Sequence, residues 1–228
     1  RVNNNVRKSY MLTWNNTLTP APAYLFGLDG TEAGEAYSVS ADGNTIFGRS
    51  PVSGDTRLHG YKIVNPGVSQ TITALPMFGD ETGSTTLQTP YGCSADGKYA
   101  CGMDYRGMEK AALWDTSAAD PALWTVTDLT DLARANGLIS EFTGNLRRAF
   151  SMGVNGVGDP VVTGRGINAA GEKRAFLITV PKWVAAIGFP RGRAVSFGSD
   201  VTFTAITNGM DNLSFQWFKN GVPVTDGS

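Results

Sequence analysis

The chain has 228 residues, and its 19 basic and 20 acidic side chains leave a net charge of −1. This balance gives no electrostatic indication of a nucleic-acid or acidic-lipid partner. No apolar run reaches the roughly 18 residues of a membrane helix. Charged residues make up only 17% of the chain and glycines number 28, a composition common in secreted β proteins. We therefore predict an extracellular or cell-surface location, with no nucleic-acid partner and no membrane insertion.

The first pattern along the chain is an apolar strand, an Asp-Gly or Asn-Gly turn and a second apolar strand. It occurs three times, over residues 36–48, 90–102 and 149–164. Asp-Gly and Asn-Gly between apolar runs predict a β-hairpin, because glycine accepts the positive φ of a tight turn. Turn formation is favoured over catalysis for three residues: Asp42, Asp96 and Asn155.

A second motif, a basic or His residue followed by an apolar strand, alternates with the hairpins. Its central residues are Tyr10, Tyr61, Ala112 and Phe176, spaced by roughly 50 to 65 residues. Each period holds about four strand-length apolar runs, which is typical of a β-propeller blade. We therefore predict an all-β fold with about three antiparallel four-stranded blade repeats. They would form a β-propeller-like domain over residues 1–180.

The third period carries extra residues, which predict one short helix packed outside the sheet. Thr127 can cap its start, and Leu129, Leu132 and Ala133 fall on one helical face. Gly137 can end the helix, because a glycine often follows the last helical turn.

The hairpin motif, in general form Ala-Tyr/Phe-Ser-x-Ser-Ala-Asp-Gly, and the alternating Arg/Lys-Ala-Phe-Leu-Trp strand resemble the bacterial extracellular repeats called the HAF family. The Ser-Ala-Asp-Gly turn is also similar to the Ser-Pro-Asp-Gly turn of TolB-type propeller blades. The resemblance covers roughly residues 6–180 and implies a secreted or surface-exposed β-propeller-like array. It implies no catalytic residue, because the family pattern consists of core and turn positions.

The composition changes after residue 180, and two strand-like segments follow at residues 198–205 and 213–224. They resemble the B and C strands of bacterial immunoglobulin-like modules, with Trp217 as the core tryptophan of strand C. The usual strand-B cysteine is absent. The resemblance implies a partial immunoglobulin-like β-sandwich over residues 181–228.

The two cysteines, Cys93 and Cys101, lie on the two arms of the second hairpin. An odd-length loop centred on Gly97 would place them opposite each other and permit a disulfide. A two-residue turn would instead pair Cys93 with Ala100 and leave two small apolar side chains. Two thiols without a nearby His pair fall short of the usual four ligands of a metal site.

No motif indicates a catalytic, cofactor-binding or metal-binding residue, and we expect no cofactor. The single histidine, His59, lies in the strand motif, where Lys110 and Arg174 are near equivalents, so we expect it at the surface. No Gly-x-Ser-x-Gly elbow or Walker lysine occurs. Pairs of carboxylates are possible among the 20 acidic residues, but nothing distinguishes one pair.

Two classes of function remain. We expect a non-enzymatic extracellular or cell-surface repeat protein that serves adhesion, binding or structural assembly into a surface layer or filament. Its partners would be copies of itself, other surface proteins or glycans. The alternative is a propeller-scaffold enzyme that acts on an extracellular polysaccharide, which a Trp-lined cleft with two close carboxylates would favour.

Three periods are fewer than the four blades that a closed propeller needs, so open sheet edges require partners. We expect either a piece of a longer protein, which the abrupt start and end of the sequence favour, or neighbouring chains that supply strands. The side chains that we predict in the core are Tyr37, Val39, Ile46, Tyr91, Tyr99, Leu113, Phe150, Met152 and Phe176.

Overall fold

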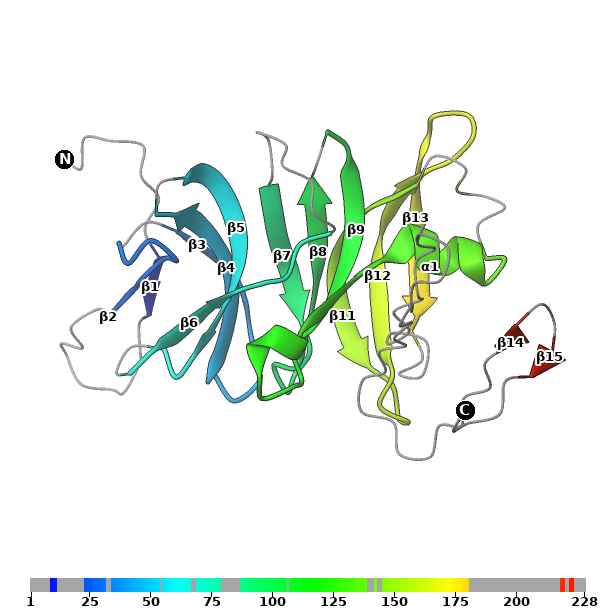
Figure 1. Ribbon diagram of the computed structural model, residues 1–228. Coiled ribbons are helices and arrows are strands. Elements are labelled where there is room, and N and C mark those ends of the chain that lie inside the picture. The colour runs from blue at the N-terminus through cyan, green and yellow to red at the C-terminus, as the bar shows by residue number, and fades with distance from the viewer. Residues whose placement is uncertain are drawn as a thin grey trace, which may run out of the picture. The chain divides into compact units, whose positions relative to one another are not determined.

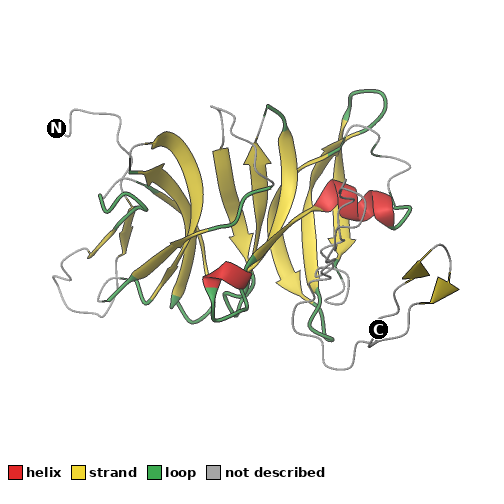
Figure 2. Cartoon of the chain, in the orientation of Figure 1, coloured by secondary structure: helices red, strands yellow, loops and turns green. Residues whose placement is uncertain are grey.

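The computed structural model describes residues 9–11, 23–31, 34–53, 55–66, 69–78, 87–105, 107–138, 142, 145–180, 218–219 and 222–223. Figure 2 shows that strands dominate this part of the chain, with short helical segments between them. The prediction of an all-β fold is therefore confirmed. The chain divides into two compact units, Arg1–Pro181 and Lys182–Ser228.

Three groups of three antiparallel strands, here called triplets, follow one another along the chain (Figure 1). In each triplet the strands pair in sequence order. The first triplet consists of β3 (Glu35–Val39), β4 (Thr45–Val52) and β5 (Asp55–Val64). The second consists of β7 (Leu87–Cys93), β8 (Tyr99–Tyr105) and β9 (Glu109–Asp115). The third consists of β11 (Leu146–Val154), β12 (Pro160–Ile167) and β13 (Lys173–Thr179).

Further strands extend the first two triplets. Strand β6 (Thr71–Ala74) pairs with β5, and β10 (Thr125–Asp128) pairs with β9. One parallel pair, Leu58 with Leu87, joins the two triplets into a mixed eight-stranded sheet, where the sequence had indicated only antiparallel pairing. No closed barrel or propeller forms among the described strands.

The turns of the first two hairpins are built by their Ser-Ala-Asp-Gly sequences. In the second hairpin, Ser94 Oγ accepts a hydrogen bond from Tyr99 N at 3.0 Å and donates one to Asp96 Oδ1 at 2.6 Å. Gly97 takes the positive φ of 65°. The same contacts recur in the first hairpin. The predicted turns are confirmed, and the aspartates serve the turn geometry.

Between its bulge and its turn, the third hairpin has two more residue pairs than either of the other two. Its turn therefore begins at Asn155, whose Oδ1 accepts a hydrogen bond from Asp159 N at 2.8 Å. The positive φ, 91°, falls on Gly158. Asn155 lies in the turn as predicted, but it occupies the position of Ser94 rather than that of Asp96.

Each triplet carries a β-bulge at the same place in its first strand. In the second triplet Pro90 pairs with Gly102 and Gly92 pairs with Cys101, so Tyr91 is the extra residue of the bulge. The glycine opposite the bulge cannot carry a side chain, because a Cβ on Gly102 would lie 2.0 Å from the Thr89 carbonyl oxygen. The other two triplets repeat both features, with Tyr37 and Phe150 in the bulges and Gly48 and Gly164 opposite them.

The core lies between the triplets and on the inner faces of their sheets. One cluster joins the first two triplets and consists of Phe47, Leu75, Ala100, Ala112 and Trp114. A second cluster joins the first triplet to the N-terminal strand pair β1 (Ser9–Met11) and β2 (Ala23–Leu25); it consists of Leu25, Ile46, Tyr61 and Ile63.

The predicted core is right in part. Ile46, Tyr99 and Leu113 are buried. Four residues are half-buried, namely Tyr37, Tyr91, Met152 and Phe176. The prediction is wrong for Val39, which is 56% exposed on the outer strand β3, and for Phe150, which is 44% exposed. The bulge accounts for Phe150, because an extra residue shifts the alternation of faces along the strand.

The single helix that the sequence predicts is present as α1 (Leu129–Ala135). Its N-cap is Asp128 rather than Thr127, with Asp128 Oδ1 accepting a hydrogen bond from Thr130 N at 2.8 Å. Gly137 follows the helix with φ of 68° and ends it, as predicted.

In the C-terminal unit the structure describes β14 (Phe218–Lys219) and β15 (Val222–Pro223), which pair antiparallel. Trp217 and the predicted strand at residues 198–205 lie outside the described residues. The immunoglobulin-like module therefore stays a prediction.

The requirement for a glycine opposite the bulge can be tested by the substitution Gly102→Ala. The added methyl group meets backbone atoms that cannot move aside independently, so we expect a loss of about 3 kcal/mol or more in the free energy of unfolding. Gly153→Ala is the matched control, because its Cβ meets no atom within 4 Å in β11. Urea denaturation measures both. Equal effects of the two substitutions would contradict the steric requirement.

The corrected core can be tested with two phenylalanines. Phe47 is fully buried, so Phe47→Ala should lower the free energy of unfolding by about 3–5 kcal/mol. Phe150→Ala removes a side chain that is 44% exposed and should cost only about 1–2 kcal/mol. Chemical denaturation of both variants checks the order, and a larger loss at Phe150 would restore the original core prediction.

Candidate functional site

The three bulges bring one aromatic side chain from each triplet into a row, here called the aromatic row: Tyr37, Tyr91 and Phe150. The ring centroids of Tyr37 and Tyr91 lie 5.6 Å apart in an edge-to-face arrangement, with 86° between the planes. Those of Tyr91 and Phe150 lie 5.7 Å apart and are tilted by 48°. These contacts are favourable geometries for aromatic pairs. The row is half-buried to exposed, so part of each ring is accessible to a ligand.

An ion pair closes the Tyr37 end of the aromatic row. The Arg49 guanidinium lies 5.4 Å from the Tyr37 ring centroid and binds Glu35 through Nε at 2.8 Å and Nη2 at 2.7 Å. Arg49 Nη1 also donates to Thr89 Oγ1 of the second triplet at 2.8 Å. Burial, together with the hydrogen bond to Glu35, raises the pKa of the Tyr37 phenol. Arg49 therefore connects the first two triplets at this end of the aromatic row.

The other end of the aromatic row is cationic, and we call it the arginine end: Arg147, Arg148 and Arg165, with Glu109. Arg165 lies 5.9 Å from the Phe150 ring centroid. Glu109 forms ion pairs with Arg148 and, at 3.7 Å, with Arg165. The hydrogen bond from Arg148 lowers the pKa of Glu109, and the charges of Arg165 and Arg147 act in the same direction. Two guanidinium groups, those of Arg148 and Arg165, therefore share the Glu109 carboxylate.

Two donors at the arginine end are buried without an acceptor among the described residues. They are the Nε atoms of Arg147 and Arg148. Buried donors in native proteins are rarely left without a partner, so such atoms call for a group that completes their hydrogen bonding. Both Nε atoms have almost no accessible surface, whereas the Arg148 and Arg165 side chains as a whole are 30% and 31% exposed.

The carboxyl groups with a clear pKa shift are poorly suited to acid catalysis. The pKa of Glu109 is lowered as described, and the hydrogen bond from Ser40 lowers that of Asp42. For Asp96, hydrogen bonds from Ser94 and Lys98 outweigh burial, and its pKa is lowered too. A general acid that works near neutral pH needs a raised pKa. These three groups are carboxylates engaged in structural contacts.

The strand register of the second hairpin decides between the two arrangements of the cysteines that the sequence left open. Cys93 pairs with Ala100 and Cys101 pairs with Gly92, so the two cysteines are not opposite and both thiols are free. Burial raises the pKa of the Cys101 thiol to about 12, which keeps it protonated and unreactive.

The single histidine does not mark a site. His59 is half-buried in β5, where the sequence had indicated a surface position. Within the described residues there is no group of three His, Cys, Asp or Glu side chains that could hold a metal ion.

Sequence reasoning missed the aromatic row because it assigned all three aromatic residues to the core. One signal could have revealed it. Each hairpin has an aromatic residue in its first strand and a glycine on the returning strand, namely Gly48, Gly102 and Gly164, and in the first two hairpins the spacing between them is identical. This pairing is the signature of a repeated bulge rather than of a regular strand.

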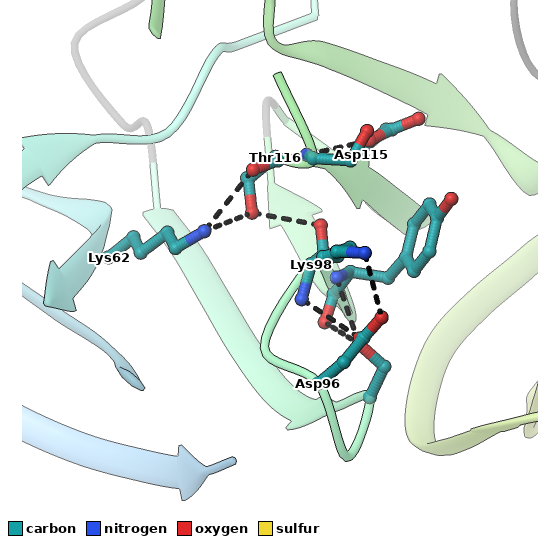
Figure 3. Close-up of polar contacts among 8 residues, drawn as sticks. Lys62, Asp96, Lys98, Asp115 and Thr116 are labelled. Carbon is teal, nitrogen blue, oxygen red and sulfur yellow. Dashed lines mark hydrogen bonds and ion pairs between the residues drawn. The ribbon is translucent and has the colours of Figure 1, made fainter. Parts of the chain in front are cut away.

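Lys62 is the most deeply buried cation described, and it links the first two triplets (Figure 3). Its Nζ donates to the carbonyl oxygen of Thr116 at 3.2 Å and to Thr116 Oγ1 at 3.0 Å. It also lies 5.8 Å from the Phe47 ring centroid and 5.3 Å from that of Trp124. Burial lowers the pKa of Lys62, against the opposing charges of Asp96 and Asp115. With 8% exposure, Lys62 is a structural link and not a ligand-binding group.

Comparisons of the chain with family models, curated proteins and solved structures found no match. The resemblance to HAF-type repeats therefore stays a prediction. In the part of the chain that the structure describes, no helix has the length and apolar character needed to cross a membrane.

The burial of the Lys62 side chain predicts how the stability of the protein depends on pH. Because the folded state lowers the pKa of Lys62 below its ordinary 10.5, the unfolded state binds more protons between the two values. Stability contributed by Lys62 is therefore fully present above pH 10.5 and is lost as the pH falls through the folded pKa. We expect the wild-type chain to gain stability relative to Lys62→Met as the pH rises from neutral toward this value.

Urea denaturation over a pH series measures this difference. Lys98→Met is the matched control, because its side chain is 58% exposed in the neighbouring turn, and it should keep the pH dependence of the wild-type chain. A difference between wild type and Lys62→Met that stays constant with pH would show that burial does not shift Lys62.

Proposed function

We propose that residues 1–180 form a β-propeller-like array of a non-enzymatic, extracellular repeat protein. The support is the repetition of one local plan, in which the bulge, the opposite glycine and the strand order recur in three triplets. The strands β6 and β10 stand beside the first two triplets as fourth strands would in a blade.

We further propose that the function of this array is to bind an anionic glycan at the aromatic row. The observation that carries the proposal is the position of the arginine end beside the partly exposed ring of Phe150. Sugar rings present apolar C–H faces that pack on aromatic side chains. Their carboxylate or sulfate groups suit guanidinium groups, which bind such anions through paired hydrogen bonds.

The charge count favours an anionic over a neutral glycan. At the arginine end, Arg148 and Arg165 pair with the single carboxylate of Glu109, and the charge of Arg147 also lowers the Glu109 pKa. The side chains of Arg148 and Arg165 are 30% and 31% exposed, so a ligand carboxylate can reach their guanidinium groups and form charge-assisted hydrogen bonds with them.

The alternative function, cleavage of an extracellular polysaccharide, has weaker support. Glycoside cleavage by two carboxyl groups requires one that stays protonated near neutral pH. Glu109, the carboxyl nearest the arginine end, has a lowered pKa and is held by Arg148. This arrangement suits ion pairing with a ligand and a guanidinium group better than proton donation.

Titration calorimetry with polygalacturonate, an anionic glycan, tests the proposal. We expect binding that weakens with salt, because exposed charges are screened, and no binding to neutral dextran. Arg165→Gln should weaken binding by about tenfold or more, since it removes a charge-assisted contact. Arg174→Gln is the matched control, because Arg174 is an arginine on the same triplet with a 49% exposed side chain. It should bind like the wild type.

Three outcomes would contradict the proposed binding function. Absence of binding to polygalacturonate is the first, and an equal loss of affinity in Arg165→Gln and Arg174→Gln is the second. The third is the release of new reducing ends from the glycan, which would support the enzymatic alternative. Unchanged thermal unfolding of both variants ensures that the comparison reports on binding.

A further inference from the structure

One strand-pair position is buried in the first two triplets and exposed in the third. It is the pair of residues directly beside the glycine that faces the bulge, on the second and third strands. The three equivalent pairs are Phe47 with Lys62, Cys101 with Leu113, and Thr163 with Leu177. In the first two pairs no residue exceeds 8% exposure, whereas Thr163 is exposed and Leu177 is 69% exposed.

The next triplet covers this position wherever a next triplet exists. Phe47 of the first triplet packs on Ala100, Ala112 and Trp114 of the second. Strand β11 of the third triplet packs against β7, β8 and β9 of the second. The approach is close, because a Cβ on Gly92 would lie 3.1 Å from the Ser151 Cα. Burial of this face is therefore a property of the repeated interface.

The opposite face is buried in the third triplet as in the others. Val162 and its strand partner Ile178 are 0% and 8% exposed. The third triplet thus has one covered face and one open face. The sequence that follows Val180 carries no further copy of either repeated motif.

The open face, defined by Ser151, Thr163 and Leu177, has the features of an unfilled packing surface. It bears a shallow hollow of about 280 Å³, lined by Ser151, Met152, Gly153, Val154, Val161 and Thr163. The outer edge of β13 has no strand partner among the described residues, whereas β5 pairs with β6 and β9 with β10. Exposed apolar surface beside an open strand edge is a common mark of an interaction site.

We propose that this open face binds a second copy of the chain in head-to-tail fashion. The element of the second copy that takes the place of a next triplet is its N-terminal strand pair, β1 and β2. In the chain itself, Leu25 of β2 packs on Ile46, Tyr61 and Ile63 of the first triplet. Strands β1 and β2 therefore pack on the first triplet as one triplet packs on the next, and they precede the first triplet in the chain.

A head-to-tail contact joins two different surfaces, so copies assemble into a closed ring or an open filament according to the rotation between them. This inference goes beyond glycan binding and does not depend on it. The proposed contact between copies uses the same face that is buried between consecutive triplets, and strands of the second copy cover it as the next triplet does within the chain.

Sedimentation velocity over a concentration series tests the proposal on the full 228-residue chain. The wild-type chain should self-associate. Leu177→Arg places a charge on the open face, on its edge strand β13, and should raise the dissociation constant by about tenfold or more. Leu138→Arg is the matched control, because Leu138 is a similarly exposed leucine, at 65%, outside the triplets. It should associate like the wild type.

The open face can also be followed by hydrogen exchange of the β13 amides. Protection that increases with protein concentration supports docking of a second copy. Protection that is complete in a monomer would show that the chain covers the face itself and would overturn the proposal. A wild-type chain that stays monomeric at its highest soluble concentration, or equal effects of Leu177→Arg and Leu138→Arg, would overturn it as well.

Discussion

The architecture depends on one steric constraint, the contact between a bulged strand and a glycine on its neighbour. At Gly102 a side chain would overlap the Thr89 carbonyl oxygen, and Gly48 and Gly164 face the same restriction. The bulge adds one residue to the first strand and turns the aromatic side chain out of the regular alternation. Because the constraint recurs in each triplet, Tyr91 and its equivalents line up across the three triplets instead of entering three separate cores.

Hydrogen bonding and charge reinforce the packing between triplets in two different ways. Arg49 joins the first triplet to Thr89 at a partly exposed edge, with Glu35 as its counter-ion. Lys62 makes the corresponding connection inside the protein, where it bonds to Thr116. A buried cation is costly unless donors and acceptors are matched, so Lys62 favours one relative position of the two triplets. The aromatic row requires that position, since its rings come from different triplets.

The features that could be predicted from the sequence are those determined by interactions between residues close together in the chain or paired across a hairpin. The turns at Asp42 and Asp96 follow from short-range hydrogen bonds and a glycine at positive φ. The equivalence of Tyr61, Ala112 and Phe176 is confirmed as well, because each lies opposite the glycine that faces a bulge. Both features depend on residues that are close in sequence or fixed by strand pairing.

The parts that could not be predicted depend on register and on contacts between triplets. The length of the turn decides that Cys93 faces Ala100, the extra residue at Tyr91 shifts the register farther along the strands, and an apolar pattern reveals neither. Phe150 resembles a core residue by type, yet its bulge leaves it partly exposed. The arginine end combines Glu109 with Arg148 and Arg165, which are far apart in sequence and meet only when the second and third triplets pack.

The turn built by Ser94 has a consequence for how the chain folds. Its hydrogen bonds span at most five residues, so a hairpin can form before any distant part of the chain has been positioned. We therefore expect each triplet to form locally and the docking of one triplet on the next to be the slower step of folding. Extra residues between two triplets should therefore slow folding little. Helix α1 is such an insertion, since it lies between the second and third triplets, before β11.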